Sequence, residues 1–292
     1  MEPMMQTPLV SVVMINWNRR EILKQVLNNL SGQTYTQYEI VICDNNSTDG
    51  APDMVEQEFP SVRLIRLNEN VGIKGYNIAF DNSQGEIIVI LDNDSYLERD
   101  GFVKIVKKFQ MYPRLGAMGC KVYNYYTNKV HHWHPTVHTD EVPAEGVDAP
   151  LFNGCAGAAR RSVLQEVGFY PEEYFLYENE RDLCTRIINA GYKVKYFTDV
   201  IGYHMVADEG RTSERLVFFS TRNLIWYNWK YLPCLTAATR TASILLRNAA
   251  AAIRSRAFRM YLKPLVVALV GLPVILKMRR VVKREYLDKI LY

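Results

Sequence analysis

The chain has 292 residues, which is long enough to bury a sizeable core as one domain or as one domain with an appendage. Hydrophobic residues make up 48% and charged residues 23%, a composition that is typical of globular proteins and argues against a disordered chain. The five cysteines show no CxxC spacing, so we expect free thiols rather than a disulfide framework. The opening segment MEPMMQTP lacks an apolar stretch, so we expect no signal peptide.

Charge is unevenly distributed along the chain. Residues 211–292 contain 16 lysines and arginines but only three acids, a net charge of about +13. Because the whole chain carries +4, residues 1–210 carry about −9. An acidic body with a basic tail predicts two surfaces with different partners.

The first 112 residues alternate between two kinds of pattern. Apolar and β-branched runs predict strands at residues 9–17, 38–44, 62–67 and 86–94. Helical spacing, often bounded by glycine, predicts helices at residues 19–32, 50–59, 72–83 and 99–112. This alternation predicts βαβ units and an α/β fold with a mostly parallel, buried sheet.

The next hundred residues are less regular. Residues 113–150 look irregular, and the small-residue segment LFNGCAGAA predicts a strand or a turn before a helix at about 162–167. A further helical pattern ends at Gly191, and a strand then ends at His204.

Polar residues follow three of the predicted strands, in the segments INWNRR, CDNNSTDG and DNDS. Ligands of such sheets bind at the carboxyl ends of the strands, so these segments form a candidate site. Asp92 and Asp94 offer short carboxylates that suit Mg²⁺ or Mn²⁺, although a solvated turn would use the same residues. Asp44 is placed to accept a hydrogen bond from a base or a ribose.

A second segment of the candidate site is NVGIKGYN, residues 70–77. Its backbone amides and Lys74 lie near a helix start, an arrangement that suits an anion. The first strand is followed neither by Gly-x-Gly-x-x-Gly nor by a Walker loop, which argues against dinucleotide and P-loop sites.

Together these segments resemble the family 2 glycosyltransferases, more narrowly their bacterial rhamnosyltransferase-like branch. The resemblance covers about residues 8–232 and rests on the segments VSVVMINWNRREILKQVLNNLSGQTYTQYEIVICDNNSTDG, NVGIKGYN, ILDNDS and YENERDLCTRIINAGYKVKYFTDVIGYH. It implies a GT-A fold, a nucleotide-diphosphate sugar donor, a divalent metal, and transfer by a single displacement with inversion. We therefore expect a catalytic domain at 1–232 and a basic helical extension at 233–292.

The resemblance also implies roles for single residues. The donor-binding set is Asn18, Asp44, Lys74, Gly75, Asn77, Asp92, Asn93 and Arg222. The metal ligands are Asp92, Asp94 and His204, which is otherwise more often a structural residue than a ligand. The acceptor pocket takes Asn153, Gly154 and Trp133. For Asn153 and Gly154 the alternative is tight strand packing; for Arg222 it is a surface salt bridge.

The segment HHWH at 131–134 is a competing metal proposal. No nearby cysteine or helical histidine pair completes a zinc set there, so we interpret the segment as a loop over the site that contacts the sugar or the acceptor.

An inverting transfer needs a base that takes the proton of the acceptor hydroxyl. The family has Glu-Asp-x-Asp before a leucine-rich helix, and here the match reads NERD, so Glu180 stands at the position of the base. Glu178 and Asp182 are rivals. Asp182 would also fit a helix cap or a surface pair with Arg186.

The basic tail combines charge with apolar segments. Arg240, Arg247 and Arg254 recur every seven residues and form a basic stripe on a helix. The apolar run 264–276 has thirteen residues and two prolines, which falls short of the roughly 20 residues that span a bilayer. We expect the tail to associate with an anionic membrane. A cap on the catalytic domain or a homodimer contact are the alternatives, and no nucleic-acid-binding motif accompanies the stripe.

The sequence thus predicts a glycosyltransferase that depends on Mn²⁺ or Mg²⁺ and inverts the configuration of the sugar. The expected donor is dTDP-rhamnose or a UDP-sugar, and the expected acceptor is a hydroxyl of a lipid-linked or cell-surface glycan. The expected location is cytoplasmic, peripheral at the inner face of the cell membrane. The alternatives are a sugar nucleotidyltransferase and a non-catalytic, membrane-bound scaffold.

Overall fold

The computed structural model describes residues 7–130, 142–205 and 213–291. Its strands are β1 (Val10–Asn16), β2 (Tyr38–Asp44), β3 (Arg63–Arg66), β4 (Ile87–Leu91), β5 (Ser95–Leu97), β6 (Leu115–Asn124), β7 (Val147–Asp148), β8 (Ala156–Arg160) and β9 (Lys193–His204). Its helices are α1 (Arg20–Ser31), α2 (Ala51–Glu58), α3 (Lys74–Asp81), α4 (Gly101–Met111), α5 (Arg161–Val167), α6 (Asn179–Asn189), α7 (Ser213–Tyr231), α8 (Cys234–Ser255), α9 (Phe258–Lys277) and α10 (Arg284–Ile290).

The strands form one sheet in the order β3-β2-β1-β4-β8-β6-β9-β5, with β7 paired to β9. β3, β2, β1 and β4 are parallel, as predicted, because a helix connects one strand to the next. The other half is mixed: β8 runs antiparallel to both β4 and β6, whereas β6 and β9 are parallel. The described part of the connection from β6 to β8 contains no helix, so an antiparallel return is possible there.

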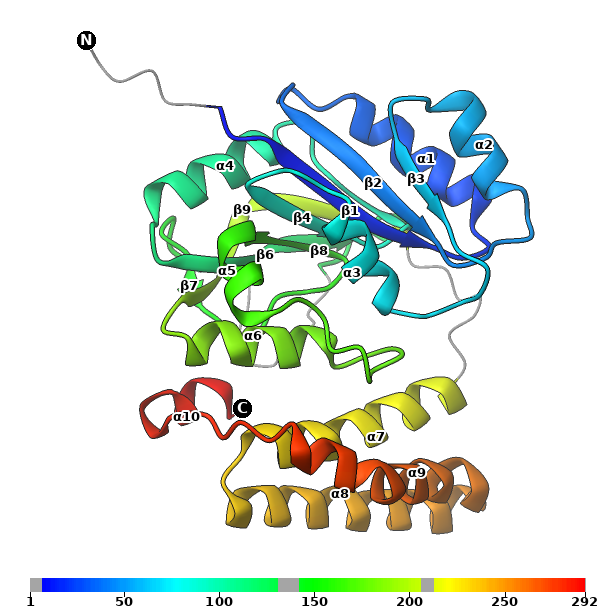
Figure 1. Ribbon diagram of the computed structural model, residues 1–292, viewed down its shortest axis with the longest axis vertical. Coiled ribbons are helices and arrows are strands. Elements are labelled where there is room, and N and C mark those ends of the chain that lie inside the picture. Colours follow the sequence, from blue (N-terminus) through cyan, green and yellow to red (C-terminus); the bar gives the residue numbers. More distant parts are fainter. Residues whose placement is uncertain (1–6, 131–141, 206–212, 292) are drawn as a thin grey trace.

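Helices cover both faces of the sheet (Figure 1). Successive side chains of β1 point to opposite faces: Val12 and Met14 pack with α1, α2 and α4, whereas Val13 packs on the side of α3, α5 and α6. Burial on both faces explains why the strands read as continuous apolar runs. All five cysteines are free thiols, as predicted.

Strand β6 corrects the expectation that residues 113–150 are irregular. It is a ten-residue strand between β8 and β9, although its sequence LGAMGCKVYN contains two glycines that disfavour strands. A Cβ on Gly116 would lie 2.6 Å from the side chain of Ile187, and one on Gly119 would lie 3.1 Å from Phe152. The glycines therefore serve close tertiary packing, which a local pattern does not reveal.

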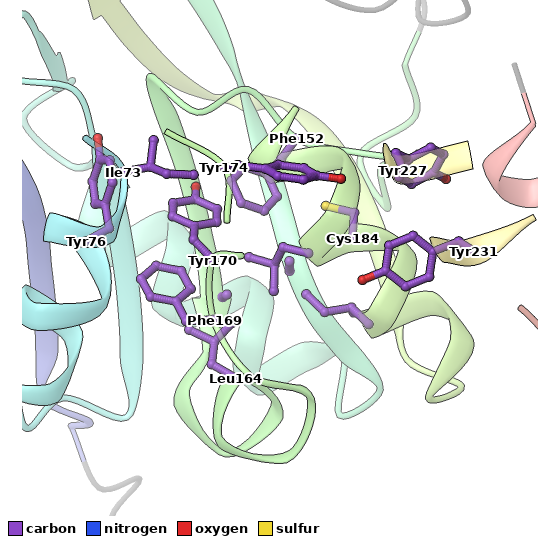
Figure 2. Packing of buried hydrophobic residues seen from close by; sticks show 14 of the residues in the cluster. Ile73, Tyr76, Phe152, Leu164, Phe169, Tyr170, Tyr174, Cys184, Tyr227 and Tyr231 are labelled. Atoms are coloured by element: carbon purple, nitrogen blue, oxygen red, sulfur yellow. The ribbon is translucent and has the colours of Figure 1, made fainter. Parts of the chain in front are cut away.

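Helices α7, α8 and α9 form a layer on one side of the α/β part (Figure 1). The indole nitrogen of Trp226 on α7 donates to the carbonyl oxygen of Ala268 on α9 at 3.0 Å. One cluster of buried hydrophobic side chains runs from α3 through α6 into α7, and Tyr174, Tyr227 and Tyr231 lie along it (Figure 2). The basic tail therefore packs on the rest of the protein through one face; the domain boundary at residue 232 stays a prediction.

Helix α9 differs from the expectation for the apolar run. Pro264 and Pro273 lie inside one helix of 20 residues, which also takes in residues 258–263. In the described part of the chain this one helix is long and apolar enough to cross a membrane, judged by length and composition only. A core helix of a soluble protein can pass the same test, although only 22% of the apolar window is buried here. The prediction that this segment is too short to span a bilayer is therefore wrong.

A buried ion cluster joins α6 to α7. Asp182 is 0% exposed, and its carboxylate lies 2.8 Å from Nε of Arg186 and 2.7 Å from Nζ of Lys230. Lys230 also lies 2.6 Å from Glu173. Burial alone would raise the pKa of Asp182, but the two cations more than offset burial and lower this pKa. The expected surface pair of Asp182 and Arg186 is thus a buried one.

We predict that Lys230→Met lowers the free energy of unfolding by about 3–5 kcal/mol, because it leaves a buried carboxylate short of a partner. The matched control is Lys24→Met, which removes a surface pair with Glu58 and should cost less than about 1 kcal/mol. Urea unfolding at neutral pH measures the free energy of unfolding of both variants.

The pairing of Asp182 contributes stability above its ordinary pKa of 3.8, and this contribution is lost as the pH falls through the lowered pKa. Equal effects of the two substitutions would contradict the structural role of the cluster.

Candidate active site

The carboxyl ends of β1, β2 and β4 meet at one edge of the sheet. β1 lies between β2 and β4, so the chain order reverses there, and ligands of α/β sheets bind at such a point. Asn93, just after β4, donates from Nδ2 to Oδ1 of Asn16 at 2.7 Å. Asn16 in turn donates to Oδ1 of Asp44 at 2.8 Å. The three polar strand ends expected from the sequence are therefore brought together.

Asp44 and Asn18 shape this edge from two loops. Asp44 is 1% exposed and accepts hydrogen bonds from Asn16 and from both the amide and the hydroxyl of Ser47. Asn18 has a φ of 51°, a left-handed conformation that asparagine tolerates, and its side chain accepts from the amide of Thr48 at 2.8 Å. Both residues hold loops at the rim, and their contact with a nucleobase stays a prediction.

Asp92, Asp94 and His204 lie together, as the sequence predicted. One ligand atom from each falls within 4.8 Å of the others. They meet because β5 pairs with the end of β9, which sets Ser95 opposite His204 and brings His204 Nε2 to 3.0 Å from Oδ1 of Asp94. Asp94 and His204 are buried, whereas Asp92 is partly exposed. Two carboxylates and an imidazole fit a divalent transition ion, although acidic clusters also occur without one.

Arg19 is a member of this site that the sequence analysis missed. Its guanidinium nitrogen Nη1 lies 3.2 Å from Oδ2 of Asp94, on the side of the carboxylate away from His204. It stands directly before α1, in the INWNRR segment that was singled out only as polar. An arginine beside a candidate metal-ligating carboxylate is suited to a phosphate group.

Glu180, in the first turn of α6, has a strongly shifted pKa. This pKa is raised to about 7, mainly because the carboxylate is buried and in part because of the negative charge of Asp92. Oε1 of Glu180 accepts hydrogen bonds from the hydroxyl of Tyr170 at 3.1 Å and from the side-chain Nδ2 of Asn179 at 2.6 Å. A Cβ on Gly154 would lie 2.3 Å from the same oxygen, so a side chain there would displace the Glu180 carboxylate. The predicted acceptor residue Gly154 therefore lies beside the predicted base.

Two tyrosines connect the base to the metal cluster. Tyr76 donates from its hydroxyl to Oδ1 of Asp92 at 3.0 Å. Its ring packs edge-on against Tyr170, with ring centroids 5.4 Å apart (Figure 2). Tyr170 then donates to Glu180, so the two carboxylates are bridged by a pair of hydroxyl donors. No sequence spacing links these tyrosines, which come from α3 and from the segment before α6.

Comparison with known proteins identifies the family. A family model described as Glycosyl transferase family 2 matches residues 11–168, more than half of the chain. The chain belongs to the family 2 glycosyltransferases.

Similar proteins and structures agree with this assignment. A Mycobacterium tuberculosis protein named N-acetylglucosaminyl-diphospho-decaprenol L-rhamnosyltransferase is 22% identical over 70% of this chain and 79% of its own length. The chain spans only 35% to 49% of the length of three other curated relatives.

Among solved structures, the mannosyltransferase PcManGT of Pyrobaculum calidifontis with GDP-Man and Mn²⁺ has a TM-score of 0.59 at 21% identity, over 90% of this chain and 86% of that one. Staphylococcus aureus TarS with UDP-GlcNAc also has a TM-score of 0.59, at 17% identity over 74% of this chain and 65% of that one. At these identities the likeness shows the fold, which is of GT-A type, as predicted.

The two rivals of Glu180 are held in ion pairs in this glycosyltransferase. Glu178 accepts from Nε of Arg181 at 2.6 Å. Asp182 lies in the buried cluster with Arg186 and Lys230, in the first turn of α6 rather than at its cap, and its pKa is lowered rather than raised. The geometry therefore favours Glu180 over Asp182 as the base, and the role itself stays a prediction.

A strained loop positions Glu180. Tyr177 and Glu178 have φ values of 67° and 63°, a left-handed conformation that is costly for residues other than glycine. Asn223 on α7 stabilises this loop: its Nδ2 donates to the carbonyl oxygens of Leu176 at 2.8 Å and of Tyr177 at 2.9 Å. Asn223 thus holds the backbone that leads into Glu180.

Arg222, the predicted donor-binding residue directly before Asn223, is buried. Its guanidinium packs over the rings of Phe219 and Trp226, and Nε donates to Oδ1 of Asn223 at 2.9 Å. Nη2 is buried and has no hydrogen-bond partner among the described residues. The alternative of a surface salt bridge is therefore wrong, whereas a contact with the diphosphate stays a prediction.

The NVGIKGYN segment serves packing in this structure. Lys74 is half-exposed and forms a surface pair with Glu172 at 3.1 Å. A Cβ on Gly75 would lie 2.9 Å from the side chain of Ile15, so this glycine allows α3 to approach β1. Asn77 donates to the carbonyl oxygen of Tyr170 at 2.9 Å and accepts from its amide at 3.0 Å. Asn77 thus positions Tyr170, and direct donor contacts of the three residues stay predictions.

The remaining predicted acceptor residues are only partly described. Asn153 is half-buried, next to Gly154, and its carbonyl oxygen accepts from the amide of Ala156 at 3.1 Å. Trp133 and the histidines of the HHWH segment lie outside the described residues.

We predict that Tyr170→Phe raises the pKa of Glu180 above its value of about 7. The hydroxyl of Tyr170 stabilises the charged carboxylate, so its loss should shift the titration upward by about half to one pH unit. Carbon-13 NMR of labelled glutamate side chains measures this pKa, with the Glu180→Gln variant assigning the signal. The matched control is Tyr192→Phe, which removes a hydroxyl from surface Glu166. A Glu180 signal that titrates near 4.5 in the native protein would contradict the description of the site.

Proposed function

We propose that this protein transfers a sugar from a nucleotide-diphosphate sugar to an acceptor hydroxyl, with the help of a divalent metal and with inversion at the anomeric carbon. The observation that carries the proposal is a carboxylate with a pKa of about 7, Glu180, bridged by two tyrosines to the cluster of Asp92, Asp94 and His204. A base and a candidate metal cluster at the ligand edge of the sheet are the two parts that such a reaction needs.

Asp92, Asp94 and His204 would hold Mn²⁺ or Mg²⁺, and the imidazole favours Mn²⁺. The ion would neutralise charge on the departing diphosphate. Arg19, which already lies against Asp94, is placed to add a second positive charge beside the diphosphate. The structure of PcManGT with GDP-Man and Mn²⁺ supports this pairing of metal and donor.

Glu180 would take the proton from the acceptor hydroxyl while the hydroxyl oxygen attacks the anomeric carbon. The bond from that carbon to the diphosphate oxygen breaks, and its electron pair leaves with the diphosphate. Attack from the face opposite to the leaving group inverts the anomeric centre. Because the pKa of Glu180 is raised to about 7, the carboxylate is ionised above this pH yet basic enough to accept a proton.

For the donor we propose dTDP-rhamnose or a UDP-sugar, and for the acceptor a lipid-linked or cell-surface glycan at the inner face of the cell membrane. The name of the Mycobacterium tuberculosis relative specifies L-rhamnose transfer and a diphospho-decaprenol carrier. TarS is seen with UDP-GlcNAc and PcManGT with GDP-Man, so neighbours of the same fold take different nucleotides. The nucleotide is therefore a matter for experiment.

We predict that Glu180→Gln lowers turnover by roughly a hundredfold to ten-thousandfold while donor binding survives, because the amide keeps the shape but cannot accept the proton. A thermal-shift screen of nucleotide-sugars with and without Mn²⁺ first names the donor, since a bound ligand stabilises the folded state by RT ln(1 + [L]/Kd). Release of the nucleotide diphosphate then measures turnover. In the native protein the rate should fall as the pH drops below about 7 and Glu180 becomes protonated.

The matched control is Glu166→Gln, which changes a carboxylate that bonds Tyr192 on the surface. It should leave both turnover and donor binding unchanged. Equal loss of donor binding and turnover in Glu180→Gln would contradict the role of a base. Donor stabilisation without turnover at any pH in the native protein would favour the scaffold alternative.

A further inference from the structure

The outer side of α8 and α9 is an exposed apolar surface. Six large aliphatic side chains there are each 58% to 76% exposed, and we call them the α8–α9 apolar face: Leu246, Ile253, Val266, Leu269, Val270 and Val274. Scattered exposed leucines are ordinary, but a contiguous apolar patch on adjacent helices marks an interaction site.

This face is distinct from the packing faces of the same helices. α8 buries Ile244 and Ala252, and α9 buries Leu265, Ala268 and Ile275, on the sides turned toward the rest of the protein. A helix that covers a soluble protein is usually polar on its outer side. These two helices are instead apolar on a second side as well.

The charged residues of α8 and α9 are all positive. No acidic residue occurs from residue 233 to 284, whereas the same stretch contains Arg240, Arg247, Arg254, Arg256, Arg259, Lys263, Lys277, Arg279, Arg280, Lys283 and Arg284. Along α9, Lys263, Val266, Val270 and Lys277 share one side by helical spacing, so basic groups bracket an apolar centre. Long basic side chains at the ends of such a stripe reach lipid headgroups while the centre contacts acyl chains.

The packing of α9 against α7 restricts how α9 can be oriented relative to a membrane. α9 lies along α7, with Trp226 against Gly271 and bonded to Ala268. α7 is tied to the catalytic part by Lys230 in the buried ion cluster and by Asn223. If α9 crossed a bilayer, the charged groups of α7 would enter hydrocarbon, which is costly. The helix axis must therefore lie parallel to a membrane surface.

We propose that the α8–α9 apolar face docks on an anionic lipid bilayer, with α9 in the plane of the interface and the catalytic part outside. A lipid surface fits better than a second copy of the chain, because two copies meeting at this face would set basic residues against basic residues. The acidic body, with about −9 over residues 1–210, is better kept away from anionic lipid, so charge also orients the molecule. The proposal does not depend on the transfer reaction.

Vesicle flotation of the full chain tests the docking. Native protein should float with vesicles of phosphatidylglycerol and phosphatidylcholine, and at least tenfold more weakly with pure phosphatidylcholine or at high salt. Val270→Glu, at a position that is 76% exposed, should weaken binding at least tenfold. The matched control Met111→Glu, at a position on α4 that is 64% exposed, should float like the native protein. Because both positions are exposed, neither variant should unfold, which circular dichroism checks.

A second experiment measures how α9 is oriented in the membrane. A fluorophore on the Val270→Cys variant, with exposed Cys234 changed to Ser, reports depth in vesicles whose lipids carry nitroxides. We expect stronger quenching by shallow than by deep nitroxides; the opposite order would indicate a spanning helix and overturn the in-plane proposal.

In the flotation experiment, a Val270→Glu variant that floats as strongly as the native protein would overturn the docking. A dimer that fails to float and that Val270→Glu converts to a monomer in light scattering would assign the face to a second copy instead.

Discussion

The parallel pairing of β1 with β2 and β4 is the constraint on which the site depends. It brings three polar strand ends to one edge and sets Asp44, Asn16 and Asn93 in a continuous hydrogen-bond network. The same edge collects carboxylates of like charge in partly buried surroundings, which is unfavourable unless cations or protons compensate. Arg19 supplies a cation at Asp94, His204 lies within hydrogen-bond distance of the same carboxylate, and a raised pKa lessens the charge at Glu180. This electrostatic strain suits the edge to the metal and the base that we propose.

Helix α7 connects this site to the other distinctive surface of the molecule. On one side its Asn223 and Lys230 hold the loop and the helix that carry Glu180. On the other side its Trp226 holds α9. If the acceptor is presented at a membrane, as we propose, Glu180 must lie at a defined height above the lipid surface. Helix α7 contacts both the segment that carries Glu180 and helix α9, so packing alone can fix this height. No conformational change has to be invoked.

Sequence patterns predicted the elements in which local and tertiary preferences agree. β1 to β4 and their helices follow from apolar runs and helical spacing, whereas β6 was missed because its glycines serve contacts with Ile187 and Phe152. The meeting of Asp92, Asp94 and His204 was predicted through the family resemblance, since more than a hundred residues separate His204 from the other two. Arg19, Tyr76 and Tyr170 were not predicted, because their roles arise only from the packing of distant segments. The burial of Asp182 in an ion cluster was not predicted, because such a cluster leaves no local signal in the sequence.

Pulsed EPR of bound Mn²⁺ tests the central claim most directly, because it detects the nitrogen of a coordinating imidazole. With Mn²⁺ and the nucleotide diphosphate of the donor, the native protein should show modulation from one nitrogen that disappears in His204→Asn. The control His132→Asn changes a histidine outside the proposed ligand set and should keep the signal. Mn²⁺ that binds without any nitrogen coupling, or a coupling that survives in His204→Asn, would contradict the assignment of Asp92, Asp94 and His204 as one metal site.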